Sequence, residues 1–280
     1  MPRFTGGAST MPELPEVETT RRGVEPALVG RSVRDVRIHD RRLRQPVTPG
    51  LTNILCGKRL LGIQRRAKYL LFDFGDGTLL VHLGMSGSLR IVAAREARLP
   101  HDHVELEFSR QHCLRFRDPR RFGLVLWVQS PGEHSLLAHL GPEPLGEAFD
   151  GDHLYRLSRG RKAAVKNFVM DGRIVVGVGN IYASEALFRA GILPTRAAGR
   201  VSRVRYATLA EEIKAVLSEA ITAGGTTLRD FMRNDGEPGY FRQDLRVYGR
   251  ADEPCVACGR PIVCRVIGQR SSFFCRSCQR

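Results

Sequence analysis

The run at residues 11–18 (MPELPEVE) places a proline directly after a methionine and directly before a carboxylate. If the chain starts at Met11 and this methionine is removed, Pro12 carries a free secondary amine. Such an amine attacks a sugar carbon and forms an iminium, the Schiff-base route of covalent catalysis, and Glu13 beside it can move protons for the attack. Proline and glutamate also suit the first turn of a helix, so this run alone favours catalysis and helix initiation equally.

Two CxxC pairs near the end of the chain have the spacing of a metal site. Sixteen residues separate the pairs, which consist of Cys255, Cys258, Cys275 and Cys278. Four thiolates fill the tetrahedral coordination of one zinc ion and leave no open position, so we predict a single structural zinc. The remaining cysteines are expected to be buried small apolar residues rather than ligands; they are Cys56, Cys113 and Cys264.

Three further segments have residue types that suit contact with nucleic acid. Residues 177–180 (GVGN) precede a helical pattern and resemble a phosphate-binding turn, although Asn180 also suits a helix N-cap. Residues 118–123 (DPRRFG) put two arginines and a phenylalanine on a turn, where they can enter a base stack. Arg270 follows Gln269 between the CxxC pairs and can reach a phosphate. For each arginine, a solvated hairpin charge is the alternative.

The formal net charge of +15 favours a polyanionic partner, although an arginine-rich composition would produce the same excess. Lysine is rare in this chain, so Lys68, Lys162 and Lys166 are candidates for positions that need a compact ammonium. Chance is the alternative for any one of them. No apolar run reaches the length of a membrane span, and residues 1–10 lack the apolar segment of a secretory signal. We therefore expect a soluble, cytoplasmic protein without a membrane partner.

The hydrophobic pattern changes from period two to helical spacing along the chain. Short alternating segments between Gly and Asp turns over residues 31–130 predict an antiparallel sandwich or barrel. Helical patterns follow the Gly/Pro-rich stretch at 140–146, and a turn-rich loop covers 234–241. The resulting α+β multidomain prediction has four parts: an unstructured extension or misassigned start at 1–11, a β-sandwich at 12–140, a helical domain at 146–232 and a cysteine-rich hairpin at 246–280.

Together these motifs resemble the formamidopyrimidine-DNA glycosylase family, from Pro12 to the C-terminus. The similarity rests on motifs in the family's order: 12–19 (PELPEVET), 65–70 (RRAKYL), 82–87 (HLGMSG), 118–123 (DPRRFG), 176–183 (VGVGNIYA) and Gln269-Arg270 in the cysteine hairpin. The resemblance implies an N-terminal β-sandwich, a helix–two-turns–helix domain and a zinc finger. It also implies a base-excision-repair enzyme that removes oxidised purines such as 8-oxoguanine and formamidopyrimidines from duplex DNA, then cuts abasic strands by β,δ-elimination.

The resemblance also implies roles for individual residues. Pro12 is similar to the nucleophile that attacks C1′, and Glu13 to the general acid that opens the sugar ring. Lys68 is similar to the lysine that holds a phosphate during β-elimination, and Arg270 to the arginine of δ-elimination. The implied DNA contacts are Met85, Arg120 and Phe122 in the void left by the flipped base, with His101, Arg161, Lys166 and Asn180 nearby. Where the family often has a lysine, this chain has Arg161, followed by Lys162.

Two other functions remain open from the sequence. An endonuclease VIII-like glycosylase acts on oxidised pyrimidines, although the loop at 234–241 resembles the segment that closes over 8-oxoguanine. A catalytically inactive damage-binding protein would result if residues 1–10 stay attached and block the amine of Pro12. We expect a monomer that binds damaged or abasic double-stranded DNA at the bacterial nucleoid.

Overall fold

The computed structural model describes residues 12–227 and 245–280. Their contacts divide the chain into two compact units. Of the described residues, unit 1 contains 12, 16–134 and 226–227, and unit 2 contains 13–15, 135–225 and 245–280. The loop expected at 234–241 lies outside the described residues. Among the described residues, no helix is long and apolar enough to cross a membrane.

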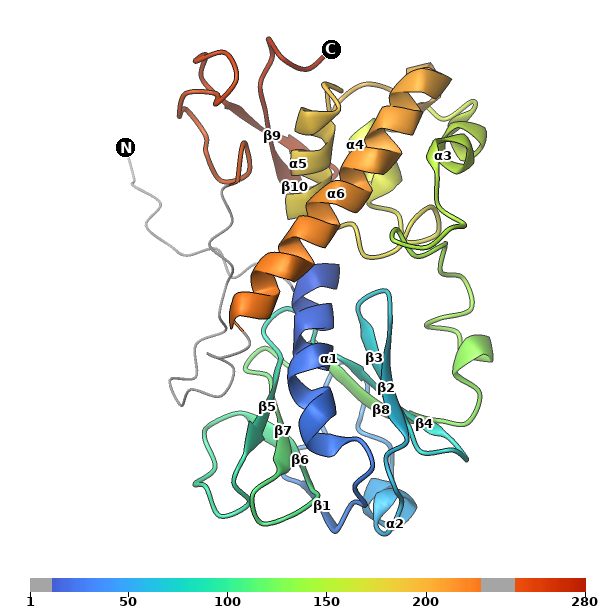
Figure 1. Ribbon diagram of the computed structural model, residues 1–280, viewed down its shortest axis with the longest axis vertical. Coiled ribbons are helices and arrows are strands. Elements are labelled where there is room, and N and C mark those ends of the chain that lie inside the picture. Colours follow the sequence, from blue (N-terminus) through green and yellow to red (C-terminus); the bar gives the residue numbers. More distant parts are fainter. Residues whose placement is uncertain (1–11, 228–244) are drawn as a thin grey trace. The chain divides into compact units, whose positions relative to one another are not determined.

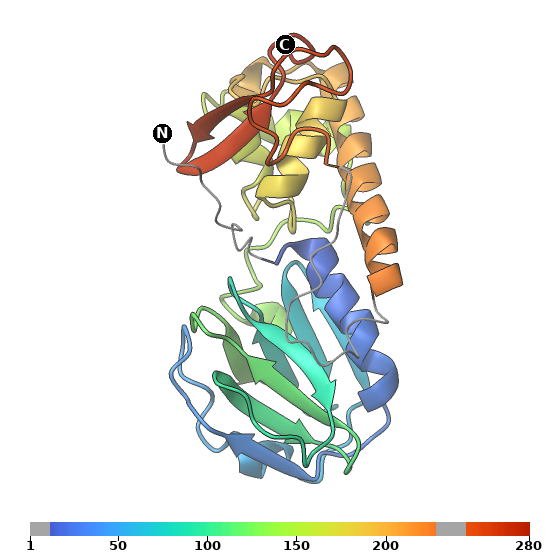
Figure 2. The same ribbon diagram turned by 90° about the vertical axis from the view of Figure 1, so that its left-hand side faces the viewer.

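Unit 1 consists mainly of helix α1 and two antiparallel sheets (Figure 1). One sheet has the order β2-β3-β4-β8, with strands at Gly62–Arg66, Tyr69–Asp73, Thr78–His82 and Leu124–Val128. The other has the order β1-β6-β7-β5, with strands at Asp35–Ile38, Asp102–Glu107, Cys113–Arg117 and Ser88–Val92. Strands β5 to β7 lie side by side in Figure 2. Apolar side chains of both sheets form one buried cluster, so the predicted antiparallel sandwich is confirmed.

Helix α1 spans Leu14–Leu28 and is the helix that proline and glutamate initiate at its first turn. Its apolar positions Val17, Val24 and Leu28 are each at most 1% exposed and join the core of the two sheets. The short helix α2 (Leu51–Leu55) adds Leu51 and Leu55 to the same cluster.

Unit 2 is helical and has its own core. It contains α3 (Gly151–Ser158), α4 (Val165–Val169), α5 (Asn180–Arg189) and most of α6 (Arg203–Thr227), with short 3₁₀ turns at Ala198–Arg200 and, in unit 1, Pro131–Glu133. Tyr182, Leu187, Tyr206 and Leu209 are buried in the centre of this core. Helix α4 does not begin before Val165, because residues 163–165 bond to the backbone of residues 196–198.

The C-terminal part of unit 2 is a β-hairpin beside a cysteine cluster. Strands β9 (Val263–Ile267) and β10 (Arg270–Phe274) pair antiparallel through the turn Gly268-Gln269, where both residues have positive φ. Positive φ at both central positions is typical of a type I′ hairpin turn, which suits the twist of paired strands. The turn therefore places Arg270, which is exposed, at the first position of β10.

The cysteines outside the cluster correct part of the sequence prediction. Cys113 is fully buried, as expected, but Cys56 and Cys264 are exposed. Cys264 lies on β9, whose three central residues are exposed, and Cys56 is the C-cap of the short helix α2. Alternation in a sequence cannot distinguish a strand face that packs on a core from one that faces water.

Candidate active site

Glu13 lies at the start of helix α5. Its Oε1 accepts a hydrogen bond from the N–H of Ile181 at 3.2 Å, and the side chain is only 4% exposed. The N–H groups of a helix start lack intrahelical partners and face the positive end of the dipole, so they stabilise a carboxylate. Gly179 is the N-cap of α5, and Asn180 is the first helical residue rather than the cap.

The glycines at 177 and 179 leave room for the residues after Pro12. A Cβ on Gly179 would lie 2.1 Å from the carboxyl carbon of Glu13, and one on Gly177 would lie 2.4 Å from Leu14. Gly177 also has φ of 77°, a conformation that favours glycine, and its carbonyl accepts from the N–H of Leu14 at 3.4 Å. The turn predicted to bind phosphate therefore holds a carboxylate of the chain itself.

Lys166 is completely buried and connects α4, α5 and the hairpin. Its Nζ donates to Asn180 Oδ1 at 2.5 Å, to the carbonyl of Ser271 at 3.1 Å and to Ser272 Oγ at 2.6 Å. Asn180 Nδ2 also donates to the carbonyl of Ser271 at 3.0 Å. An ammonium has three donors, so the fold uses all three to fix Asn180 and the residues directly after Arg270.

Burial lowers the pKa of Lys166 to about 8, and the nearby charge of Arg270 acts in the same direction, while Glu13 and Cys264 oppose it. A buried ammonium needs hydrogen-bond acceptors to remain charged, and three oxygens supply them here. The contact of Lys166 with DNA stays a prediction, and the geometry gives this residue a second role, because its ammonium orients Asn180.

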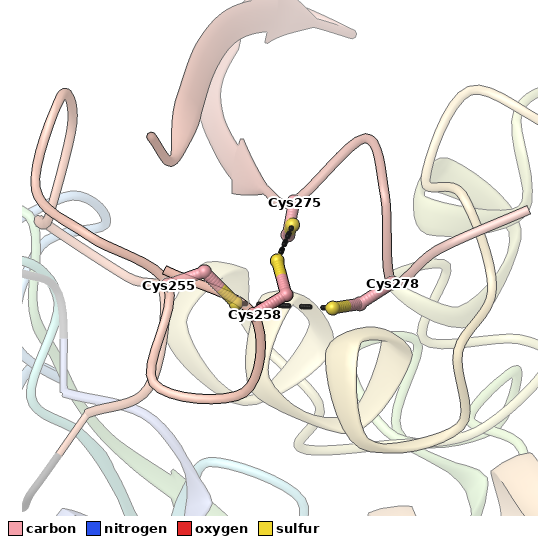
Figure 3. A group of neighbouring side chains, drawn as sticks. All are labelled: Cys255, Cys258, Cys275 and Cys278. Carbon is pink, nitrogen blue, oxygen red and sulfur yellow. Dashed lines mark hydrogen bonds between the residues drawn. The ribbon is translucent and has the colours of Figure 1, made fainter. Parts of the chain in front are cut away.

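The four predicted zinc ligands lie together in unit 2 (Figure 3). All their sulfur atoms are within 4.8 Å of one another; Cys255 and Cys278 are 3.9 Å apart and Cys258 and Cys275 3.5 Å. Tetrahedral zinc with Zn–S bonds of about 2.3 Å separates its sulfurs by about 3.8 Å. The site therefore fits one zinc ion that is saturated by protein thiolates.

Lys68 lies in unit 1, in the two-residue turn between β2 and β3. Ala67, its neighbour in the turn, has φ of 55°, and the carbonyl of Ala67 accepts from Arg65 Nη1 at 3.0 Å. Arg65 Nε in turn lies 3.2 Å from a carboxylate oxygen of Glu18 on α1. These contacts fix the turn that carries Lys68 to the helix that begins two residues after Pro12.

Glu18 is 8% exposed and also pairs with Arg21 and Arg22. Burial raises the pKa of Glu18, but the hydrogen bonds from Arg21 and Arg22 and the charge of Arg65 outweigh burial and hold it below its usual value. The carboxylate consequently stays charged and keeps Arg65 against the turn of Lys68.

Met85 lies in the segment between β4 and β5 and is partly exposed. The imidazole Nδ1 of His82, at the end of β4, accepts from the N–H of Gly84 at 2.9 Å. Burial, together with the smaller effects of the charges of Lys68 and Arg44, lowers the pKa of His82 to about 4. His82 is therefore neutral at pH 7, as its role as acceptor requires, and it orders the backbone just before Met85.

The turn at 118–123 presents the other two predicted void-filling residues to solvent. The guanidinium of Arg120 lies 5.2 Å from the ring centroid of Phe122, and Phe122 is 44% exposed. Arg121 is bound to the fold, because its Nη2 lies 2.8 Å from Asp40 Oδ2. His101 is exposed with φ of 71°, and its carbonyl accepts from the N–H of Asp118 at 3.1 Å.

Arg161 is exposed, and its Nε donates to the carbonyl of Leu157 at 2.7 Å. Its guanidinium carbon lies 5.5 Å from the ring centroid of Phe168.

The sequence does not predict the contacts of Glu185. This residue is 2% exposed, and its carboxylate accepts from the N–H groups of Arg246, Val247 and Tyr248. Some sixty residues separate Glu185 from its partners, so no motif spacing indicates this contact.

Unit 1 brings the turns of Met85, His101, Arg120 and Phe122 together, because Asp118 accepts from Ser86 Oγ and donates its N–H to the carbonyl of His101. Unit 2 brings together Glu13, Lys166, Asn180 and the hairpin that starts with Arg270. Three family models match the chain one after another along the sequence. They are the formamidopyrimidine-DNA glycosylase N-terminal domain at residues 11–125, the formamidopyrimidine-DNA glycosylase H2TH domain at 140–232, and the zinc finger found in FPG and IleRS at 252–280.

The chain is 58% identical over 271 residues to a formamidopyrimidine-DNA glycosylase of Methylococcus capsulatus, and 61% identical over 271 residues to one of Syntrophotalea carbinolica. Both alignments cover 96% of this chain and 100% of the relative. The chain belongs to the formamidopyrimidine-DNA glycosylase family. In this glycosylase, the cysteine cluster is the zinc finger of that family and is built to bind one structural zinc ion.

Solved structures of formamidopyrimidine-DNA glycosylases share the fold of this glycosylase. The protein from Thermus thermophilus superposes with a TM-score of 0.81 at 41% identity and covers 96% of this chain and 98% of its own. A Lactococcus lactis glycosylase, bound to DNA with an abasic site, superposes with a TM-score of 0.85 at 31% identity. The same Lactococcus lactis protein in complex with Fapy-dG DNA superposes with a TM-score of 0.86 at 32% identity. Both superpositions cover 96% of this chain and 100% of the Lactococcus lactis chain.

Proposed function

We propose that Pro12 is the nucleophile of this glycosylase and that Glu13, Lys68 and Arg270 are its other catalytic residues. The chain is a DNA glycosylase with abasic-site lyase activity, and it acts in base excision repair of oxidised purines. DNA with formamidopyrimidine lesions or abasic sites, as bound by the Lactococcus lactis relative, is the proposed substrate.

The proposed reaction begins when the amine of Pro12 attacks C1′ of the extruded nucleotide and the damaged base leaves. A base inside a duplex shields C1′, so the nucleotide must first leave the stack. Glu13 donates a proton to the sugar ring oxygen, the ring opens, and an iminium forms between Pro12 and C1′. Lys68 holds a phosphate during β-elimination of the 3′ phosphate, and Arg270 serves δ-elimination of the 5′ phosphate.

The observation that carries this proposal is the position of Glu13. Its carboxylate is held by the first turn of α5, next to a glycine that no larger residue can replace without displacing it. A carboxylate fixed in this way, covalently adjacent to a proline, supplies proton transfer at the atom where the amine reacts. A helix start alone needs no such contact with a second, distant helix.

The test compares two forms of the protein, one beginning at Pro12 and one retaining residues 1–11. Only the first has a secondary amine at Pro12. Borohydride reduction in the presence of 8-oxoguanine DNA should trap a covalent complex with the first form and not with the second. Glu13→Gln in the Pro12 form is the matched control, and we expect it to bind the DNA while trapping falls at least about tenfold. Equal trapping by both forms would contradict the proposal.

We further propose that His101, Arg161 and Asn180 contact phosphates, that Lys166 orients Asn180, and that Met85, Arg120 and Phe122 fill the void in the duplex. The protein acts as a cytoplasmic, nucleoid-associated monomer, with domains at 12–140, 146–232 and 246–280. Nitrocellulose filter binding at increasing salt tests the phosphate contacts. Loss of Arg161 should reduce the slope of log K against log salt by about 0.9, because counterions are released from phosphates that a cation neutralises. Loss of the uncharged Asn180 should weaken binding and leave the slope unchanged.

A further inference from the structure

Asp118 opens the turn that carries Arg120 and Phe122, and it is completely buried in unit 1. Both of its carboxylate oxygens accept hydrogen bonds. Oδ1 accepts from Ser86 Oγ at 2.6 Å, and Oδ2 accepts from the N–H of Gly123 at 2.8 Å. The carboxylate therefore closes its own turn at residue 123 and, through Ser86, reaches the separate segment that carries Met85.

Ser86 extends this connection to Arg120. Because its hydroxyl proton is donated to Asp118, its oxygen accepts from the backbone N–H of Arg120 at 3.1 Å. The backbone of Asp118 makes a third link: its N–H donates to the carbonyl of His101 at 3.1 Å, and its carbonyl accepts from His103 Nε2 at 2.8 Å. Three chain segments thus meet at Asp118, two through its carboxylate and one through its backbone.

The same segments are in close backbone contact. A Cβ on Gly84 would lie 2.5 Å from the carbonyl carbon of Phe122 and from the N of Gly123. A Cβ on Gly123 would lie 2.8 Å from the carbonyl oxygen of His82. Because no side chain separates the two backbones, a movement of one segment moves the other.

We propose that Asp118, acting through Ser86, is a positioning residue that sets the relative placement of Met85, Arg120 and Phe122 for entry into the duplex. This inference rests on the proposed function, in which these three side chains fill the void left by the extruded base. Reacting groups misplaced by about 1 Å lose rate by about a hundredfold. A buried carboxylate that accepts two directed hydrogen bonds provides the required rigidity, because its oxygens cannot be satisfied if either segment shifts.

The variants Asp118→Asn and Ser86→Ala test this role. The asparagine amide replaces one acceptor with donors, so it opposes either the Ser86 hydroxyl or the Gly123 N–H. Ser86→Ala removes the link between the segments and leaves the Asp118–Gly123 contact. The matched control is Glu105→Gln on β6. Glu105 is also a buried carboxylate, but it lies 2.8 Å from Arg115 Nε and makes none of the contacts of Asp118.

Two substrates separate positioning from general damage to the enzyme. Excision of 8-oxoguanine from duplex DNA requires the void to be filled, whereas borohydride trapping on a single-stranded abasic oligonucleotide does not. We expect both variants to lose about ten- to a hundredfold in single-turnover excision from the duplex, with trapping on the single strand within about twofold of the parent. Equal losses on both substrates, or no loss on either, would overturn the proposal.

A second measurement needs no turnover. 2-Aminopurine placed opposite a tetrahydrofuran abasic analogue changes its fluorescence when side chains enter the stack beside it. The parent and Glu105→Gln should produce this change on binding, and Asp118→Asn and Ser86→Ala should produce less than about half of it. A fluorescence change of parental size with both Asp118→Asn and Ser86→Ala would overturn the positioning role. No change with the parent, or failure of the parent to form a borohydride-trapped complex, would instead contradict the proposed function.

Discussion

Protonation of His82 is expected to destabilise unit 1 at mildly acidic pH. In the unfolded chain the imidazole takes up a proton below its ordinary pKa of 6.5, whereas in the folded protein it does so only below about 4. Between these values the unfolded state binds more protons, so stability is lost as the pH falls from 6.5 towards 4. The physical cause is burial first, then the charges of Lys68 and Arg44.

The loss of stability can be calculated from the difference between the pKa of His82 in the unfolded and in the folded state. At 1.36 kcal/mol per pH unit, the distance from 6.5 to about 4 corresponds to about 3 kcal/mol, of which about 2 kcal/mol is lost by pH 5. His82→Asn isolates the contribution, because the amide oxygen can accept from the N–H of Gly84 but does not titrate. The free energy of unfolding of the parent should thus fall by about 2 kcal/mol more than that of the variant between pH 7 and pH 5.

Urea unfolding, monitored by tryptophan fluorescence, measures this difference in unit 1, where His82 lies. Trp127 is the single tryptophan of the chain; it lies on β8, opposite Leu79 of β4, and its ring is 6.0 Å from that of Phe74. His112→Asn, at the turn between β6 and β7, controls for removal of a histidine elsewhere in unit 1. If the parent and His82→Asn lose stability in parallel between pH 7 and pH 5, the buried neutral imidazole does not contribute and the reasoning fails.

Three further outcomes follow from the sites described above. Cys275→Ser or chelation of zinc should unfold the cysteine hairpin, because zinc binding by four thiolates contributes about 10 kcal/mol or more to the folding of such sites. Circular dichroism should show that the rest of the protein is folded, and DNA-binding assays that it has lost binding. Full cleavage by the metal-free protein would contradict this. Gly179→Ala should displace the Glu13 carboxylate, whose carbon lies 2.1 Å from the added Cβ, and reduce excision at least about tenfold; unchanged single-turnover rates would show that the contact is dispensable. Arg120→Ala should lose most of the preference for cytosine over adenine opposite the lesion, about ten- to a hundredfold, whereas Arg121→Ala should mainly weaken binding. If the ratio of excision rates opposite cytosine and adenine stays at the parental value in Arg120→Ala, recognition of the base by Arg120 is refuted.

The sequence predicts the strands and helices whose apolar pattern is regular, and it fails where the pattern is weak. β3 (YLLFD) and β4 (TLLVH) are apolar segments on either side of the Gly-Asp-Gly turn at 75–77, so the sequence predicts a strand on each side of it. β2 (GIQRR) has Ile63 as its single buried residue and was not predicted, since pairing with β3 rather than its own pattern makes it a strand. α2 has five residues, too few for a helical period to show.

Motifs predict the candidate catalytic residues and the zinc ligands, but they do not predict the contacts that hold these residues. Local spacing indicates Pro12, Glu13 and the four thiolates, because these act next to one another in the sequence or in pairs. The contacts of Glu18 with Arg65 and of Glu185 with Tyr248 join residues far apart in the chain. A buried charge and an exposed one have the same sequence signature, so only the folded structure distinguishes them.

The carboxylate at the start of α5 has a consequence for competition between anions. Glu13 is tethered to the position it occupies, since Leu14 donates to the carbonyl of Gly177 at the same turn. A tethered group acts at an effective concentration in the millimolar range or above, whereas a free phosphate or sulfate must bind from bulk solution. The helix start is therefore already neutralised by an internal ligand, and buffer anions that inhibit this enzyme should do so by competing with DNA at its exposed arginines.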